Sequence, residues 1–187
     1  EVIDATIYRI NHKRCTSKDL MQFVKAPDFP TGGIIITVED LENIYQTGKG
    51  VVRVLCKTHI EEDKSCNHIV ITEIPYGVDK SSLVQNIAKC RVNNNIDAIL
   101  DIRDETDKDG LRICIDVKKE ADAETTKKFI ISKGVLTSTI KFNMLVINHY
   151  RPSVLSLLQV IDCYIEHQID VITRRSNFDL KKYRDRL

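Results

Sequence analysis

The sequence predicts an α+β fold in which helices pack on a mixed β-sheet, and three observations lead to this prediction. Apolar residues recur at helical spacing near both ends of the chain, and they alternate with a period of two through much of the middle. Strand-like and helix-like segments then follow one another in the order ββαββαβ. A layered fold needs a sizeable core, which 187 residues with 42% hydrophobic side chains can supply.

The first part of the chain is predicted to be helical. Three isoleucines in the first ten residues have helical spacing, and the segment TSKDLMQFV begins with an N-cap at Thr16 or Ser17. The segment APDFPTGG that follows contains two prolines and two glycines, which exclude the interior of a helix or strand. A further helix is predicted in TVEDLENIYQ, and it ends at Gly48 and Gly50.

The alternation typical of β-strands begins after Gly50. Strands are predicted in GVVRVLCKTHI, NHIVITEI, IDAILDIR, LRICIDVK and STIKFNMLVI. A helix in DKSSLVQNIAKC has Asp79 as its N-cap and Leu83, Ile87 and Cys90 on one face. A second helix is predicted in AETTKKFIISK, so that strands and helices alternate through the middle of the chain.

The C-terminal segment predicts one long helix, because the chain has no Gly or Pro from Ser153 to Leu187. At 1.5 Å per residue its length would be on the order of 50 Å. A single stripe follows positions 161, 165, 169, 172, 176, 180, 183 and 187. No other predicted helix is long enough to cover this stripe. We therefore expect it to pair with a second copy or with a return helix outside the chain, and its four isoleucines to be exposed in the isolated chain.

The charge of the chain excludes a protein that is basic throughout, since the net charge is only +1 with 29% charged residues. The charge is uneven, with nine acidic against five basic residues in 101–124 and six basic against two acidic residues in 174–187. No apolar run is long enough to span a membrane or to form the hydrophobic region of a signal peptide. Six cysteines without a C-x-x-C pair predict reduced thiols in a reducing compartment.

Two segments are candidate metal sites, and we predict no metal at either. Cys56, His59, Cys66 and His68 have the spacing C-x2-H-x6-C-x-H, which fits no standard zinc finger, and both histidines fall on strand patterns. The segment DIRDETDKDG approximates the pattern of a calcium loop from Glu105 onward.

The surroundings of this acidic segment disfavour its interpretation as a calcium loop. It lies between two predicted strands rather than two helices, and the eighth position of the pattern, where an apolar residue belongs, is Arg112. Asp and Gly are also the residues that hairpin connections favour. We therefore predict a solvated hairpin whose loop, with Asp107 and Asp109, repels DNA phosphates.

Several sequence blocks together resemble one family. They are APDFPTGGII, YQTGKG, IVITEIPYGVDKSSLVQNIA, ILDIRDETDKDGLRICIDVKK, FNMLVI and HQIDVITRRSNFDLKK. In this order and spacing they resemble the A subunit of bacterial-type type IIA DNA topoisomerases, DNA gyrase or topoisomerase IV. The resemblance implies a helical connector after a winged-helix domain in 1–30, an α/β tower domain in 31–150, and the outgoing helix of a coiled coil in 151–187.

The resemblance also implies an activity and partners. Enzymes of this family cut both strands of one duplex, pass another duplex through the break and reseal it. They use ATP and Mg²⁺ held by a partner B subunit, in an A2B2 heterotetramer that acts on double-stranded DNA. The implied location is the bacterial cytoplasm with its nucleoid, or alternatively an organelle such as a plastid.

The catalytic group of the family is not expected in this chain. The family's nucleophile is a tyrosine that directly follows an arginine, and none of the six tyrosines here follows an arginine. A P-loop, a G-x-S-x-G elbow and an H-E-x-x-H motif are also absent from the sequence. We therefore predict no catalytic residue here and an inactive isolated chain.

What remains is a DNA-binding and mechanical role. In the family the arms of the bent gate duplex run across the towers, and such contacts go mainly to phosphates. The candidate DNA-binding residues are Lys49, Arg53, Lys57 and Lys80. Family members usually have Asn at the position of Asp79, and the extra carboxylate weakens a phosphate role for this loop. The alternative is a stand-alone RNA-binding α+β module, which would require exposed aromatic residues on central strands.

Overall fold

A computed structural model describes residues 1–36, 40–108, 110–148 and 150–186 of the chain and confirms the α+β class. Thr37, Asp109, His149 and Leu187 therefore lie outside the described residues. Among the helices that are described, none combines the length and the apolar composition needed to cross a membrane. All six cysteines are free thiols, as predicted.

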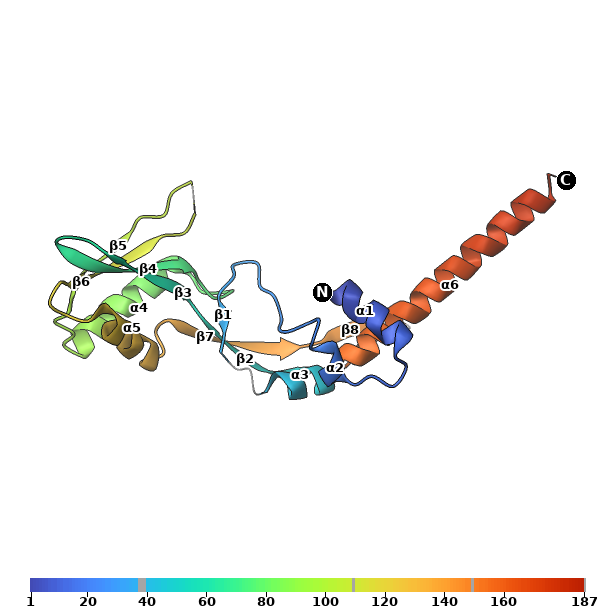
Figure 1. The fold of residues 1–187 in the computed structure, drawn as a ribbon, viewed down its shortest axis with the longest axis horizontal. Coiled ribbons are helices and arrows are strands. Elements are labelled where there is room, and N and C mark those ends of the chain that lie inside the picture. The colour runs from blue at the N-terminus through green and yellow to red at the C-terminus, as the bar shows by residue number, and fades with distance from the viewer. Residues whose placement is uncertain (37–39, 109, 149, 187) are drawn as a thin grey trace. The chain divides into compact units, whose positions relative to one another are not determined.

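The chain divides into two compact units, and Figure 1 shows the elements of both. The helical unit comprises Glu1–Pro27, Glu39–Val51 and Lys141–Leu187. The sheet unit comprises Asp28–Val38 and Val52–Ile140. Two of the passages from one unit to the other lie within strands β2 (Lys49–Leu55) and β7 (Thr137–Asn143). The division into a connector, a tower and an outgoing helix stays a prediction.

The sheet unit is built on a four-stranded sheet with the order β3-β4-β6-β5. Its strands are β3 (Lys57–Glu62), β4 (Cys66–Glu73), β5 (Ile99–Asp104) and β6 (Ile113–Lys118). All three pairings are antiparallel, whereas the sequence predicted a mixed sheet. The reason is the β5–β6 hairpin, which places β6 between β4 and β5. Strands β4 and β5, which a simple β-α-β segment would pair in parallel, are therefore not neighbours.

Helices α4 (Lys80–Asn93) and α5 (Ala123–Ser132) cover one face of this sheet (Figure 1). The period of two directs alternate strand residues to this face, where they form the core with the helices. The core includes Ile69, Ile71, Ile113, Ile115, Val117, Leu83, Ile87 and Ile130. The predicted apolar face of α4 is confirmed, and Asp79 caps this helix by accepting the N–H of Ser82 at 2.8 Å.

Two predicted strands are each divided in the structure. The first divides at Cys56, whose N–H donates to the carbonyl of Leu136 at 2.9 Å, into β2 (Lys49–Leu55) and β3. The second divides at Met144, whose N–H donates to Gly48 at 2.8 Å, into β7 (Thr137–Asn143) and β8 (Leu145–Asn148). Strand β8 pairs with β9 (Arg151–Val154), and the remaining sheet has the order β1-β2-β7, with β1 at Ile34–Ile35. Sequence alternation alone did not predict these partner changes.

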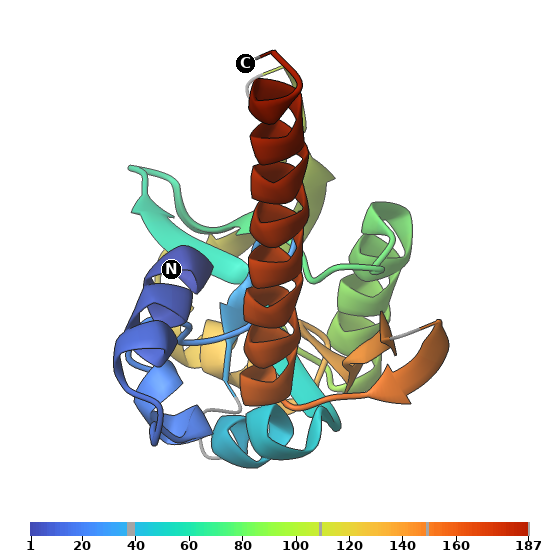
Figure 2. The ribbon, with the colours of Figure 1, turned by 90° about the vertical axis from the view of Figure 1, so that its right-hand side faces the viewer.

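The helical unit gathers three short helices around the first turns of a long one, as Figures 1 and 2 show. They are α1 (Val2–Asn11), α2 (Ser17–Leu20), α3 (Leu41–Thr47) and the long helix α6 (Leu157–Arg184). Thr16 forms a capping box at α2, which is shorter than the segment predicted. Gly48 ends α3 in the left-handed conformation, with φ of 70°. Arg9 of α1 forms a two-pronged ion pair with Asp162 of α6 at 2.7 and 3.0 Å.

Helix α6 differs from its prediction in two respects. It begins at Leu157 rather than near Ser153, because Ser153 belongs to β9 and Ser156 provides the N-cap. The expectation of four exposed isoleucines is wrong for Ile161, which is 2% exposed, and for Ile165, because both pack against the short helices. The expectation is confirmed for Ile169 and Ile172, which are 60% and 50% exposed.

Candidate nucleic-acid interface

The DFPTGG and TEIPY segments meet at Glu73, in the sheet unit. Gly33 donates its N–H to Glu73 Oε2 at 2.7 Å, and a Cβ at Gly32 would collide with the same carboxylate. Both glycines have positive φ values, 74° for Gly32 and 98° for Gly33, which L side chains rarely adopt. The positive φ values and these close contacts favour glycine at both positions of the loop.

Glu73 also holds Lys57, one of the predicted DNA-binding residues. The Lys57 ammonium lies 2.7 Å from Glu73 Oε1. The Gly33 N–H, and then the Lys57 ammonium, stabilise the carboxylate and lower the pKa of Glu73. Sequence reasoning did not single out Glu73, although it stands in the TEIPY block. Lys57 is thus positioned at the loop, with its charge balanced by a carboxylate.

Lys80, the second predicted residue of the sheet unit, stands at the first position of α4 and has a similar partner. Its ammonium lies 2.7 Å from Asp104 Oδ2 at the end of β5. The pKa of Asp104 is lowered to about 2, first by the Lys80 ammonium and then by Thr106. The N-terminus of a helix favours anions, but here Asp79 already occupies it as the N-cap.

The other two predicted residues lie on β2. Lys49 and Arg53 are exposed, and they alternate with buried Val52 and Val54 along the strand. Lys49 belongs to the helical unit and Arg53 to the sheet unit. The structure therefore places three of the four cations in the sheet unit and pairs Lys57 and Lys80 with carboxylates that the sequence analysis did not identify.

The acidic segment is a hairpin, as predicted. Strands β5 and β6 pair antiparallel on either side of it, and Asp107 forms an isolated bridge with Gly110. Thr106 donates its N–H to Asp104 Oδ1 at 3.1 Å, which tightens the turn. Of the candidate calcium ligands, Asp109 lies outside the described residues. Strands, rather than the helices of a calcium loop, flank this segment.

The sheet face opposite α4 and α5 carries a chain of ion pairs and hydrogen bonds, and we call it the polar face. It comprises His59, Glu61, Cys66, His68, Arg103, Glu105, Arg112 and Asp116. Arg112 is its centre, with two bonds to Glu61 at 2.7 and 2.9 Å and one to Glu105 at 3.1 Å. Arg112, and then His59, lower the pKa of Glu61 to about 2.

The residues of the candidate zinc set are separated by the fold. Cys56 is buried in the apolar core, where desolvation raises its pKa to about 12, and His59 bonds to Glu61 at 2.8 Å. Cys66 and His68 remain together on β4, and the structure adds Asp116 of β6, which the zinc set did not include. Pairing between strands distant in sequence creates this group.

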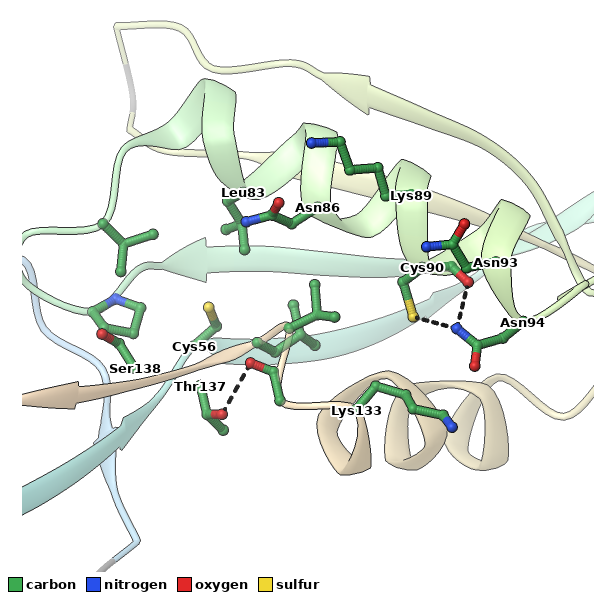
Figure 3. Close-up of a pocket in the computed structure, with 15 residues that line it drawn as sticks. Cys56, Leu83, Asn86, Lys89, Cys90, Asn93, Asn94, Lys133, Thr137 and Ser138 are labelled. Carbon is green, nitrogen blue, oxygen red and sulfur yellow. Dashed lines mark hydrogen bonds between the residues drawn. The ribbon is translucent and has the colours of Figure 1, made fainter.

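A pocket of about 480 Å³ lies in the sheet unit between α4 and the connection from α5 to β7 (Figure 3). Asn94 donates its side-chain N–H to the carbonyl of Cys90 at 2.9 Å, so this polar group is already satisfied. The Cys56 thiol also lines the pocket, and its raised pKa leaves little thiolate at neutral pH. We therefore assign no chemistry to the pocket.

Two tyrosines of the helical unit, Tyr8 and Tyr45, pack against other rings. Tyr45 is 2% exposed, and desolvation raises its pKa to about 12. Its ring packs edge-on against Phe142. Tyr8 packs against Phe23 and His12 in the same unit. With its pKa raised in this way, the Tyr45 phenol is a poor nucleophile at neutral pH.

Comparison with known proteins gives similar sequences over the whole chain. The topoisomerase 4 A subunit of Bacillus subtilis strain 168 is 44% identical over 187 residues, which cover 100% of this chain and 23% of that protein. The corresponding protein of Streptococcus pyogenes serotype M1 is 44% identical over 188 residues, with the same coverage. The gyrase A subunit of Thermotoga maritima is 40% identical over 184 residues, covering 98% of this chain and 23% of its own length.

The chain thus spans about a quarter of the length of these curated relatives. The family of DNA gyrase/topoisomerase IV A subunits matches residues 1–187. The DFPTGG and TEIPY blocks that carried the resemblance are also the segments joined through Glu73. The chain belongs to the family of DNA gyrase and topoisomerase IV A subunits.

Proposed function

We propose that this chain is the part of a type IIA topoisomerase A subunit that supports and binds the arms of the gate DNA during ATP-dependent strand passage. The main observation in support of this proposal is the family match over all 187 residues. The placement of Lys57 and Arg53 in the sheet unit, with Lys57 fixed beside the glycine loop through Glu73, supports it.

The proposed contacts go to phosphates and do not read sequence. Ammonium and guanidinium groups, together with loop N–H groups, are the usual donors to phosphate oxygens. Lys57 and Lys80 are each 2.7 Å from a carboxylate, so a phosphate must compete with that carboxylate for the ammonium. We therefore expect these two lysines to contribute less than a full phosphate contact each.

The proposal includes partners outside this chain. Exposed Ile169 and Ile172 on the distal turns of α6 support pairing with a further helix, either of the same A subunit or of a second copy. In the complete enzyme we expect two A and two B subunits in the cytoplasm, with ATP and Mg²⁺ bound through the B subunits. Strand cleavage requires a tyrosine outside this chain, so we expect the isolated chain to be inactive.

The alternative of an RNA-binding module is less well supported. Recognition of single-stranded RNA on a sheet uses exposed aromatic rings for base stacking. Strands β3, β4, β5 and β6 contain no aromatic residue other than His59 and His68. Both imidazoles are bonded to carboxylates, at 2.8 and 2.7 Å. The polar face therefore lacks the stacking surface that this alternative needs.

The test is the salt dependence of binding to duplex DNA, measured by fluorescence anisotropy. If the chain neutralises two to four phosphates, the slope of log K against log salt should be roughly −2 to −4, with a Kd on the order of 10⁻⁴ to 10⁻⁶ M. Arg53→Ala should reduce the magnitude of the slope by about one and leave sequence preference unchanged. Lys80→Ala should also reduce the magnitude of the slope, by less than about one, because a phosphate must compete with Asp104 for the ammonium.

The matched control is Lys128→Ala, which removes an exposed cation from α5. It should change the slope less than Arg53→Ala does. Asp107→Ala should leave binding unchanged or strengthen it slightly, because it removes a negative charge from the hairpin. Binding that is independent of salt, or a marked preference for single-stranded RNA, would contradict the proposal.

A further inference from the structure

We propose that Cys66 and His68 form a binding site for a soft divalent cation such as Zn²⁺, with Asp116 orienting the imidazole. The site lies on the polar face of the sheet unit. It differs from the four-residue zinc set for which the sequence predicted no metal, because it contains Asp116 and neither Cys56 nor His59. It is separate from the proposed DNA contacts and does not depend on them. The three side chains offer three donor atoms that all lie within 4.8 Å of one another.

Strand geometry brings the three side chains together. Cys66 and His68 are two residues apart on β4, so their side chains leave the same face of the sheet. Asp116 of β6 stands directly opposite His68 in the antiparallel register. The group is therefore built into two paired strands of a four-stranded sheet, and no loop has to fold to assemble it.

The distance between the donor atoms fits a metal. Cys66 Sγ lies 3.7 Å from His68 Nε2. Zn–S bonds of about 2.3 Å and Zn–N bonds of about 2.0–2.1 Å at a tetrahedral angle require the two ligand atoms to be roughly 3.5 Å apart. A single zinc ion could therefore bridge the two atoms with a shift of a few tenths of an ångström.

Asp116 leaves the correct imidazole nitrogen available. Its Oδ1 lies 2.7 Å from His68 Nδ1, which fixes the proton on Nδ1 and directs the lone pair of Nε2 toward Cys66. Arg103 donates to the same oxygen at 3.0 Å and balances the carboxylate charge. A carboxylate behind a ligating histidine is a common arrangement at zinc sites and increases the basicity of the imidazole.

The donor set determines which cations fit. A thiolate and an imidazole favour Zn²⁺, Co²⁺ or Cd²⁺, whereas Mg²⁺ and Ca²⁺ prefer oxygen ligands. On binding, the Cys66 thiol releases its proton to solvent and the sulfur forms the metal bond. Water molecules would complete the coordination, while Asp116 remains bonded to the other nitrogen of the imidazole. Cys66 and His68 are only partly buried, so the cation can enter from solvent.

The test uses Co²⁺ as a spectroscopic probe of the 187-residue chain under reducing conditions. Titration should produce a thiolate-to-cobalt charge-transfer band, which Zn²⁺ should abolish by competition and Mg²⁺ should leave unchanged. Cys66→Ser should remove the band. His68→Ala should weaken binding at least tenfold, and Asp116→Asn by about 10–100-fold, since it changes a residue behind a ligand.

The matched control is Cys163→Ser, which removes another partly buried thiol and should retain the band and the affinity. Circular dichroism of every variant separates loss of binding from loss of folding. If His68→Ala unfolds the sheet, Asp116→Asn still tests the site, because asparagine has nearly the same shape as aspartate. The absence of a charge-transfer band, its persistence in Cys66→Ser, or its loss in Cys163→Ser would overturn the proposal.

Discussion

The two faces of the four-stranded sheet come from the same strands but are stabilised in different ways. Toward α4 and α5, β4 and β6 present Ile69, Ile71 and Ile115, all fully buried in one apolar cluster. Toward the other side, the same strands present His68 and Asp116, which bond to each other at 2.7 Å. A period of two is thus enough to separate an apolar core from a polar surface.

The polar face also contains two buried residues that belong to neither apolar cluster of the fold. Val70 is 0% exposed and Cys114 is 1% exposed. Cys114 donates its S–H to Glu105 Oε2 at 3.0 Å, and burial together with this carboxylate raises its pKa to about 11. Charged side chains therefore cover these two positions, as the stems of long polar side chains commonly do. The comparison predicts that removing an apolar side chain will cost more stability than breaking an ion pair.

The largest effect is expected on the apolar face. Ile115→Ala leaves a cavity beneath the helices and should lower the free energy of unfolding by about 2–5 kcal/mol. Denaturation with urea, followed by circular dichroism, measures the loss. The matched control Val92→Ala, at a side chain that is 71% exposed on α4, should change stability by less than about 0.5 kcal/mol. Equal losses in both variants would mean that this face is not the core.

A smaller effect is expected at the centre of the polar face. Arg112→Met removes three hydrogen bonds to Glu61 and Glu105 but keeps much of the apolar stem. These side chains are 34–39% exposed, so solvent screens the pairs and the loss should be about 1 kcal/mol. Lys128→Met, at an exposed position of α5, serves as the control in the same urea titration. If Arg112→Met lowered the free energy of unfolding as much as Ile115→Ala does, the polar face would contribute as much to stability as the apolar face, contrary to this expectation.

The smallest effect concerns pH. The pKa of Glu61 is lowered from 4.5 to about 2, so the folded state holds its proton less tightly than the unfolded state does. Its stabilisation is complete above the unfolded value and is lost as the pH falls toward 2. Because Glu61 is 39% exposed, we expect less than about 1 kcal/mol from it.

Urea midpoints measured from about pH 5 to about pH 2, where carboxylates titrate, test this expectation. Glu61→Gln should flatten the acid side of the stability profile. Glu62→Gln changes the neighbouring strand residue, for which the described part of the chain contains no ion pair, and should leave the profile unchanged. A Glu61→Gln profile as steep as that of the unmodified chain would show that the Arg112 pairs do not contribute.

Local sequence patterns were sufficient to predict the α+β class, the cap at Asp79, the buried face of α4 and the hairpin around the acidic segment. They narrowed the first N-cap to Thr16 or Ser17, and the structure shows that it is Thr16. Each of these features depends on residues that are close together in the sequence. Local periodicity and the residue types of turns are therefore enough to predict them. The family resemblance could likewise be recognised from contiguous blocks, and the comparisons confirm it.

Tertiary structure alone decided where strands change partners at Cys56 and Met144, and which isoleucines of α6 are covered. It also decided that Lys57 and Lys80 are balanced by Glu73 and Asp104, and that Cys66 and His68 are joined by a residue 48 positions after His68. Each of these features depends on which distant segment becomes a neighbour. The spacing of apolar residues in a strand or helix shows which of its faces is buried. It does not show which distant segment covers that face.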